Sequence, residues 1–314
     1  MVEAAVNARG RVTQARFRTL TESGRVVMTH TANYEPNRNL HAKTAIVYIP
    51  GIFLGGRDDT AGKVAQPLAH VFDMRARAVS VEMSRKGQKS PQEEATGINN
   101  YLHMLTERQG FERFIMVGMS YGASVAISVA AHNERIAGLV LVSPRLNHLP
   151  RFYLKLGAVR DAVGTVTDRI LHPIRSKEED KFIGRYVGDS VRGAAKTASR
   201  RQFSGTISAC VPSNPDTARI RVPVSIITGD RDYLAHPNNI IPDATYRQNP
   251  DRRTKFLKEC YFRNAPTVSM DIIPGGRHGY ALAHPYEVAA LARQAMENMK
   301  VLPQNERRRR REVR

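Results

Sequence analysis

Apolar residues fall mostly into short continuous runs, with stretches of helical periodicity between them. Runs that are apolar at successive positions are typical of strands buried between two layers of helices. They predict strands at 44–49, 76–81, 114–117, 138–142, 222–228 and 268–273. The helical pattern predicts helices at 61–72, 95–109, 123–133 and 285–299. This alternation indicates an α/β fold, in which a mostly parallel twisted sheet is flanked by helices.

Two stretches interrupt the alternation. Residues 145–221 are polar, basic and helical only in patches, so we predict a helical cap or lid inserted above the sheet. Residues 1–144 and 222–306 then form the core, and 307–314 form a disordered arginine-rich tail. We also expect an N-terminal hairpin with strands at 16–20 and 25–31, and an irregular excursion at 233–266 before the last strand.

The pentapeptide Gly118-Met119-Ser120-Tyr121-Gly122 lies between a predicted strand and a predicted helix. A small residue two places on either side of a serine permits a very tight strand-to-helix turn, which strains the serine backbone and leaves its hydroxyl clear of the sheet. Backbone N–H groups at the start of the helix point toward that hydroxyl. Ser120 is therefore the candidate nucleophile.

A serine hydroxyl needs a base to act as a nucleophile, usually a histidine held by a carboxylate. Asp230 and Asp232 follow the predicted strand at 222–228, and His278 follows the one at 268–273. The resulting chain order of serine, aspartate and histidine is one of the known orders for this geometry. Either aspartate meets this requirement, and His278 is the candidate base.

Two further histidines compete with His278. His284 directly precedes Pro285 and is better interpreted as a residue at the start of the last helix. His236 lies beside the loop of the two aspartates, and we interpret it as a surface residue.

Taken in order, these motifs resemble the α/β-hydrolase superfamily over about residues 44–299. The resemblance covers an oxyanion loop at 48–53, an acidic-then-glycine loop at 82–90, the nucleophile elbow at 118–122, an acid loop at 229–232 and a histidine loop at 275–279. One departure is Pro50-Gly51, which stands where the family commonly has a histidine–glycine pair.

The resemblance also implies roles for single residues. It favours Asp232 as the carboxylate partner of the histidine, with Asp230 as a residue that caps the loop. It implies an oxyanion hole made by the backbone N–H groups of Tyr121 and Ile52, with Phe53 as a substitute for Ile52. The side chains of these residues would then shape the pocket.

The expected function is that of a serine hydrolase, which cleaves an ester, thioester or related acyl bond through an acyl-enzyme. Acyl transfer and carbon–carbon bond hydrolysis use the same three groups and stay open. Dehalogenases and epoxide hydrolases are excluded, because they use a carboxylate nucleophile and position 120 is a serine. The chain also has no tryptophan, which a dehalogenase uses to bind the halide. The alternative from another class is a non-catalytic module that binds nucleic acid or an acidic partner.

The net charge of the chain indicates which kinds of partner it attracts. The formal net charge of the 314 residues is +19, to which the tail 307–314 contributes +5 and the range 145–221 contributes +8. Such an excess attracts polyanions and acidic ligands, so the acyl substrate is a candidate anion and the tail a candidate contact for nucleic acid.

The remaining features exclude several classes of site. Two cysteines, Cys210 and Cys260, exclude a disulfide framework and a four-cysteine metal site. No histidine spacing typical of a metal site occurs, so we expect neither a metal nor another cofactor. No apolar run approaches the ~20 residues that span a bilayer, and the first residues lack the layout of a secretory signal. We expect a soluble cytoplasmic protein of undetermined oligomeric state.

Overall fold

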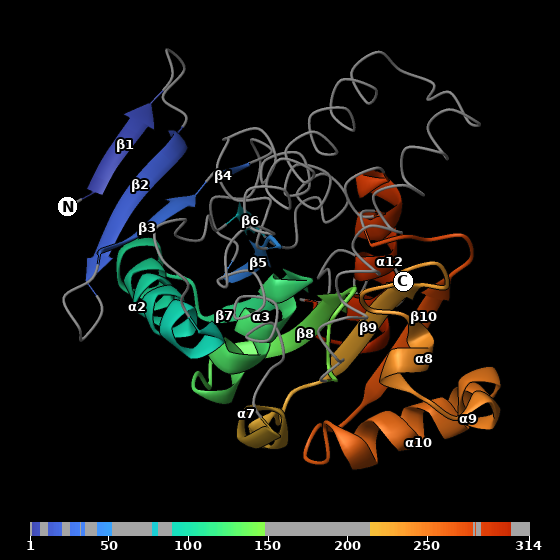
Figure 1. The fold of residues 1–314 in the computed structure, drawn as a ribbon. Coiled ribbons are helices and arrows are strands. Elements are labelled where there is room, and N and C mark those ends of the chain that lie inside the picture. Colours follow the sequence, from blue (N-terminus) through green and yellow to red (C-terminus); the bar gives the residue numbers. More distant parts are fainter. Residues whose placement is uncertain are drawn as a thin grey trace, which may run out of the picture.

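A seven-stranded sheet forms the centre of the molecule (Figure 1). The computed structural model describes residues 2–6, 12–20, 26–31, 33–34, 43–51, 77–80, 90–147, 214–278, 280 and 284–302. The strand order is β10-β9-β8-β7-β5-β6-β4. The six parallel strands are β5 (Thr44–Ile49), β6 (Arg77–Ser80), β7 (Arg113–Met119), β8 (Ile136–Val142), β9 (Val224–Gly229) and β10 (Val268–Ile273). The short β4 (Asn33–Tyr34) pairs antiparallel with β6. The predicted α/β fold with a mostly parallel sheet is confirmed.

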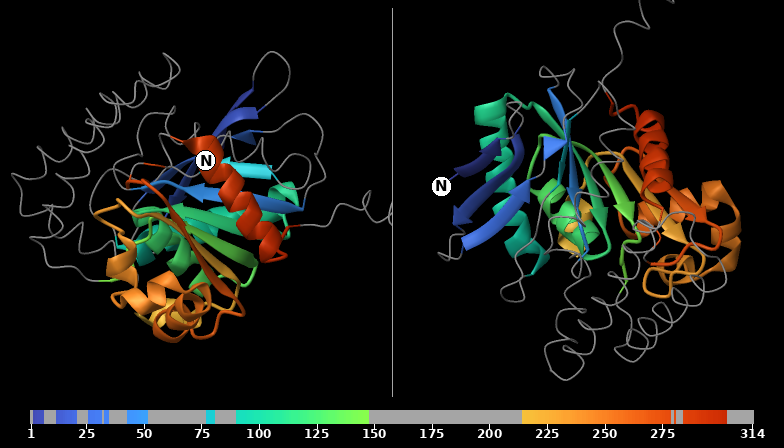
Figure 2. Two further views of the ribbon diagram at one scale, coloured as in Figure 1. Left: turned by 90° about the vertical axis from the view of Figure 1, so that its right-hand side faces the viewer. Right: turned by 90° about the horizontal axis from the view of Figure 1, so that it is seen from above.

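Helices cover both faces of this sheet (Figure 2). One face packs against α2 (Pro91–Gln109), α3 (Tyr121–Ala131) and α10 (Pro250–Cys260), and the other against α12 (Pro285–Asn298). Alternate residues of one strand therefore enter different cores. In β5, Val47 belongs to the α2–α3 side, whereas Ile46 and Tyr48 belong to the α12 side. Burial on both faces explains why these strands are apolar at successive positions.

Helix α2 starts earlier than its apolar periodicity predicts. Ser90 is the N-cap and forms a capping box with Glu93, and Pro91 occupies the first turn. These residues satisfy backbone N–H groups that a helix start leaves without partners, so the helix begins at Pro91 and not at 95. At its other end Gly110 adopts a left-handed φ of 71°, which stops the helix.

The N-terminal strands form a separate antiparallel sheet of three strands, β1 (Val2–Val6), β2 (Val12–Leu20) and β3 (Val26–Thr31). β2 and β3 are the predicted hairpin, while β1 was not predicted. Figures 1 and 2 show this sheet beside α2, and its strands β2 and β3 also contact the edge strands β4 and β6 of the central sheet.

The stretch 233–266 is largely helical, so the prediction of an irregular excursion was wrong. It contains α8 (Pro237–Ile240), α9 (Ala244–Gln248) and α10. Each of these helices is capped by a side chain that accepts backbone N–H groups, from His236, Asp243 and Asn249 respectively. Short helices with strong caps have little apolar periodicity, and periodicity alone therefore missed them.

The described chain stops at Asn147 and resumes at 214, on either side of the predicted cap. The Asn147 side chain is hydrogen-bonded to the carbonyl of Asn239 and to the Tyr261 hydroxyl, the latter at 2.5 Å. Residues 148–213, the predicted helix at 61–72 and the tail lie outside the described residues. The division into core, cap and tail therefore stays a prediction.

On the return side, α7 (Asn214–Arg219) packs against the core. Its buried Asp216 accepts hydrogen bonds from Ser128 Oγ at 2.7 Å and from Gln92 Nε2 at 3.1 Å, and lies 3.3 Å from His132 Nε2. Both described ends of the interrupted segment are thus held to the core by polar contacts.

Candidate active site

Ser120 occupies a strained turn between β7 and α3. Its φ of 52° and ψ of −116° lie outside the regions that L-residues normally adopt. The turn is fixed by a hydrogen bond of 2.9 Å from the Ser120 N–H to the carbonyl of Val142 on the neighbouring strand. Strained backbone of this kind occurs mostly at functional sites.

The two glycines of the elbow are required by close backbone packing. A Cβ on Gly118 would lie 2.5 Å from the carbonyl oxygen of Gly122. A Cβ on Gly122 would overlap the carbonyl oxygens of Ile49 and Pro50. The start of α3 therefore lies directly against the end of β5.

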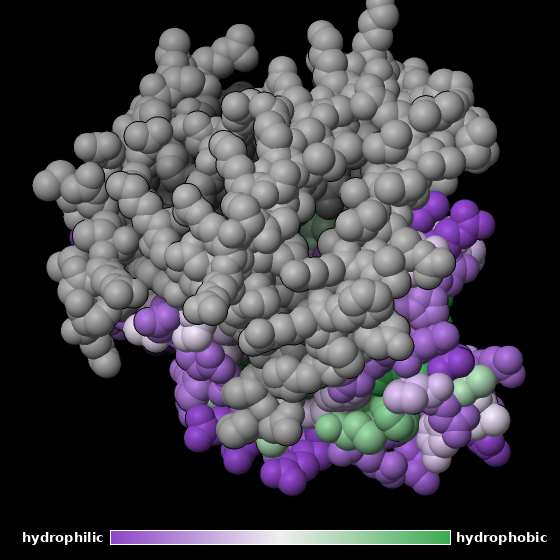
Figure 3. Space-filling view, in the orientation of Figure 1, coloured by the Kyte–Doolittle hydropathy of each residue, from purple (hydrophilic) through white to green (hydrophobic). Residues whose placement is uncertain are grey.

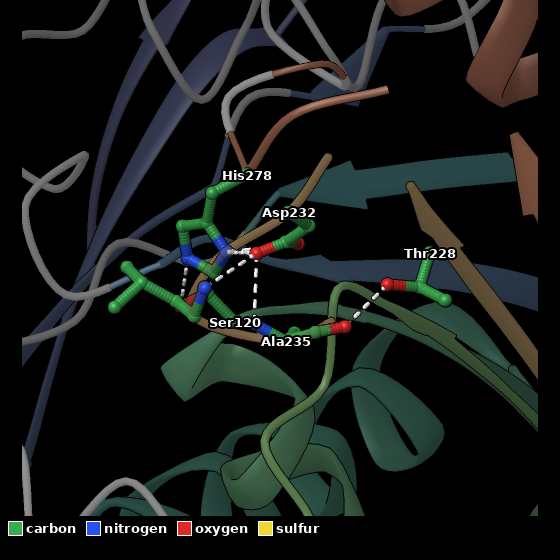
Figure 4. Close-up of polar contacts among 6 residues, drawn as sticks. Ser120, Thr228, Asp232, Ala235 and His278 are labelled. Carbon is green, nitrogen blue, oxygen red and sulfur yellow. Dashed lines mark hydrogen bonds and ion pairs between the residues drawn. The ribbon is translucent and has the colours of Figure 1, made fainter. Parts of the chain in front are cut away.

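Three side chains from three strand ends converge at this turn (Figure 4). His278 Nε2 lies 2.8 Å from Ser120 Oγ, and His278 Nδ1 lies 3.0 and 3.1 Å from the two carboxylate oxygens of Asp232. Ser120 follows β7, Asp232 follows β9 and His278 follows β10. Because parallel strands end at the same edge of a sheet, residues far apart in the sequence meet there.

Asp232 is fully buried and surrounded by donors. Its Oδ1 accepts the backbone N–H groups of Leu234 at 3.0 Å and Ala235 at 2.7 Å. Burial by itself raises the pKa of this carboxyl, but the His278 imidazole, the Ala235 N–H and the Ser143 hydroxyl together outweigh burial. The pKa of Asp232 is therefore held below its ordinary value, and the group is ionised at neutral pH.

The acid loop and the histidine loop are packed backbone to backbone. A Cβ on Gly229 would overlap Gly276, and the Arg231 N–H donates to the Gly276 carbonyl at 2.9 Å. Asp230 is exposed, and its carboxylate accepts the Gly275 N–H at 2.7 Å. Asp230 thus caps the neighbouring loop, while Asp232 contacts the histidine.

The sequence matches the family model described as serine aminopeptidase, S33, over residues 83–279. The chain belongs to this family. The matched range contains Ser120, Asp232 and His278, and it covers more than half of the chain. The S33 protein is accordingly a serine hydrolase with the α/β-hydrolase fold. A comparison with curated proteins finds no match.

Solved structures agree with this S33 assignment at the level of the fold. A bacterial membrane phospholipase A has a TM-score of 0.58 and 16% identity, with 92% of this chain and 87% of that chain covered. An esterase from Pyrococcus furiosus has a TM-score of 0.56 and 14% identity, with 96% and 98% covered. A serine hydrolase from Cycloclasticus zankles has a TM-score of 0.56 and 15% identity, with 90% and 98% covered.

The two histidines that competed with His278 in the sequence have structural contacts. His284 is the N-cap of α12, stacks on Tyr280 with ring centroids 4.4 Å apart, and lies 3.5 Å from Glu287. His236 is half-buried, and its Nδ1 accepts the Asn238 N–H at the start of α8. The interpretation of His236 as a plain surface residue was incomplete, because it caps a helix.

Of the residues predicted to form the oxyanion hole, Tyr121 is the one that the structure describes. Tyr121 directly follows Ser120 and is the first residue of α3, as the elbow requires. Ile52 and Phe53 lie outside the described residues. Gly51 is the last described residue before them, and the backbone just before it packs on Gly122.

One residue of the site was missed by the sequence reasoning. Ser143 is buried, with 3% of its surface exposed, and it is among the groups that lower the pKa of Asp232. It follows β8, on which no motif had been recognised. A serine after an apolar strand gives no signal of this effect in the sequence.

Within the described ranges of the S33 protein, no group of three or more His, Cys, Asp or Glu residues is arranged to hold a metal. None of the helices among those residues combines the length and apolar character of a bilayer span. The coloured part of the surface in Figure 3 is mostly hydrophilic.

Proposed function

We propose that this serine hydrolase cleaves carboxylic esters, thioesters or related acyl bonds through an acyl-enzyme on Ser120. The observation that carries the proposal is the continuous hydrogen-bonded chain from Asp232 through His278 to the Ser120 hydroxyl. The base lies within the 2.6–3.2 Å that proton transfer needs, as does the group that orients the base.

In the first step Ser120 Oγ attacks the substrate carbonyl carbon, and His278 Nε2 takes the hydroxyl proton. Asp232 accepts the Nδ1–H of His278, which keeps Nε2 free to act as the base and stabilises the imidazolium. His278 then gives the proton to the leaving oxygen or sulfur as the carbonyl–leaving group bond breaks. In the second step His278 takes a proton from water, which attacks the acyl carbon, and then gives this proton to Ser120 Oγ as the acyl–Oγ bond breaks.

The oxyanion of each tetrahedral intermediate would be bound by the backbone N–H groups of Tyr121 and Ile52. Tyr121 stands at the N-terminal end of α3, where the helix dipole favours negative charge. Packing of Gly122 against Ile49 and Pro50 brings the chain that precedes Ile52 to the same place. Two such donors contribute mainly in the transition state, and each is worth about 3 kcal/mol of barrier.

The family description raises peptide amides as a second substrate class. Aminopeptidase substrates carry a cationic N-terminus, which the formal net charge of +19 repels at long range. Neutral or anionic acyl substrates meet no such repulsion. We therefore place esters and thioesters before aminoacyl amides, and anionic esters before neutral ones.

Labelling by a fluorophosphonate probe tests the nucleophile. Ser120 should be labelled in the folded chain, and Ser120→Ala should abolish both labelling and turnover of p-nitrophenyl butyrate. His278→Gln should lose turnover as well, whereas the matched variant His284→Gln should keep it, since His284 stands at the start of α12 and contacts Tyr280 and Glu287. Turnover that survives Ser120→Ala would reject the mechanism.

A panel of matched substrates tests the class of bond and the charge preference. Esters and thioesters should be cleaved faster than aminoacyl p-nitroanilides, and anionic esters faster than neutral ones, with a preference that salt weakens. A product formed with an added alcohol in place of water would reveal an acyltransferase. RNA binding that depends on residues 307–314, without turnover or labelling, would favour the non-catalytic alternative.

A further inference from the structure

The segment 229–235 begins with the acid loop and folds back onto the strand that it leaves. Figure 4 shows the contact that closes it: Thr228 Oγ1, on β9, donates to the Ala235 carbonyl at 2.6 Å. Both residues are buried, each with 1% of its surface exposed. A side chain of the strand is therefore bonded to the backbone of the segment that carries Asp232.

The strand alone does not require a threonine at position 228. Valine has nearly the same shape and the same branching at Cβ, and it suits a buried strand equally well. A buried hydroxyl costs free energy unless it is hydrogen-bonded. The bond of 2.6 Å to Ala235 meets this requirement, so the contact accounts for the hydroxyl.

Ala235 connects this contact to the carboxylate of the triad. Its N–H donates to Asp232 Oδ1 at 2.7 Å, while its carbonyl accepts the Thr228 hydroxyl. The same Oδ1 lies 3.0 Å from His278 Nδ1. Through the backbone of Ala235, a chain of contacts thus runs from β9 to the base (Figure 4).

The backbone on the other side of Asp232 is held at a different place. The Arg231 N–H donates to Gly276 O, in the histidine loop, at 2.9 Å. Asp232 therefore lies between two anchors, one on the loop of the base and one, through Thr228, on its own strand. Loss of the second anchor would let the residues after Asp232 move, and the N–H groups that orient the carboxylate would move with them.

We propose that Thr228 is a positioning residue: its hydroxyl holds the Ala235 backbone in the place from which the N–H orients the Asp232 carboxylate. In this orientation the carboxylate accepts the Nδ1–H of His278. The proposal rests on the function proposed above. Because Thr228 acts through Ala235 and Asp232, it affects the activation of the nucleophile and not the binding of substrate. Its loss should lower kcat and leave KM nearly unchanged.

Thr228→Val tests the hydroxyl, because it keeps the branched shape and removes the donor to the buried Ala235 carbonyl. We expect kcat for p-nitrophenyl butyrate to fall about tenfold, with KM changed by less than about twofold. Thr228→Ser restores the hydroxyl and should recover kcat to within about threefold of the wild-type value. Thr106→Val is the matched control, since the Thr106 hydroxyl also donates to a carbonyl, that of Leu102 within α2, at 3.1 Å. It should leave both constants unchanged.

Rates are referred to the folded fraction, which circular dichroism measures, so that a loss of stability alone does not lower them. A Thr228→Val enzyme with the wild-type kcat overturns the proposal, as does an equal loss in Thr106→Val or a Thr228→Ser enzyme as slow as Thr228→Val. If Thr228→Val does not fold, Thr228→Ser and Thr228→Ala give the same comparison, because they differ by the hydroxyl alone. Thr228→Ala should then be about tenfold slower than Thr228→Ser, and equal rates would overturn the proposal.

A spectroscopic measurement distinguishes failure of this proposal from failure of the proposed function. The proton between His278 Nδ1 and Asp232 should give a low-field proton NMR resonance in the full chain without substrate. In Thr228→Val this resonance should shift and exchange faster with water, and in Thr228→Ser it should return. An unchanged resonance in Thr228→Val overturns the positioning role whatever the substrate. If the resonance responds as expected but the wild-type chain hydrolyses no ester, the proposed function alone is contradicted.

Discussion

Replacing the buried carboxylate by an amide, Asp232→Asn, tests the site most directly, because it exchanges one heavy atom, an oxygen for a nitrogen, and nearly keeps the volume. The two backbone N–H groups of Leu234 and Ala235 both point at Oδ1, so the asparagine oxygen must take that position. The amide nitrogen then takes the position of Oδ2, which is 3.1 Å from His278 Nδ1. An amide nitrogen is a donor and favours His278 Nδ1 as its acceptor, in competition with the uncharged asparagine oxygen, which lies 3.0 Å from the same Nδ1.

This exchange places the imidazole proton on Nε2, which faces the Ser120 hydroxyl at 2.8 Å and then cannot take its proton. Turning the amide round sets its nitrogen against the two backbone N–H groups, and each buried unpaired donor costs about 1–3 kcal/mol. The unproductive tautomer and the loss of the negative charge that stabilises the imidazolium both lower the rate. The expected loss in kcat is about 10³–10⁴-fold, or about 4–5.5 kcal/mol, comparable with the same replacement in serine proteases.

Initial rates of p-nitrophenyl butyrate hydrolysis measure this loss, and Asp230→Asn is the matched control. Asp230 stands two residues earlier and accepts the Gly275 N–H at 2.7 Å, which an asparagine oxygen can also do. The control should keep kcat within about threefold. An Asp232→Asn enzyme with more than a tenth of the wild-type rate would refute the reasoning, as would an equal loss in the control.

Asp232→Asn should also change how the free energy of unfolding depends on pH. The folded-state pKa of Asp232 lies below its ordinary value, so the ionised carboxylate contributes stability above about pH 4, and this contribution is lost as the pH falls through the lowered pKa. The difference in free energy of unfolding between wild type and Asp232→Asn should therefore be largest at neutral pH and shrink below about pH 4. Urea melts across this range measure it, and a difference that grows in acid would contradict the sign.

Three further substitutions can be tested. Gly122→Ala tests the elbow turn, with Gly110→Ala as its control, and Tyr261→Phe tests the contact with Asn147 beside the predicted cap. Gly122→Ala should abolish turnover and lower Tm by about 5 °C or more, because its Cβ overlaps backbone oxygens at the end of β5. Gly110→Ala, whose Cβ meets nothing within 4 Å, should cost only about 1 kcal/mol for its left-handed φ and keep full activity. Tyr261→Phe removes the hydroxyl bonded to Asn147 and should lower the free energy of unfolding by about 1 kcal/mol, read from urea melts; an unchanged urea midpoint would contradict the role of this contact.

Much of the fold was predictable because burial on both faces of a strand leaves a direct trace in the sequence. Continuous apolar runs located all six parallel strands, though β6, β7, β8 and β9 differ from their predicted bounds by one to two residues. The meeting of Ser120, His278 and Asp232 was also predictable, since the carboxyl ends of parallel strands share one edge. The topology brings together what the sequence separates by up to 158 positions.

The rest depended on features with no periodic trace. The helices at 237–260 are specified by caps and prolines, and the start of α2 by the box of Ser90 with Glu93. Ser143 is a different case. Its positive φ of 47° and its effect on the pKa of Asp232 are not visible in the residue types alone.

The polar contacts of Asn147 and Asp216 have a consequence for how such a protein can diversify. These two residues flank the predicted cap, and each is held to the core by side chains outside the triad. If a different segment were inserted between these points, the nucleophile, the base and the acid would stay unchanged. Natural or laboratory evolution could thus exchange the 148–213 cassette and redirect substrate choice, while the reaction itself is left as it is.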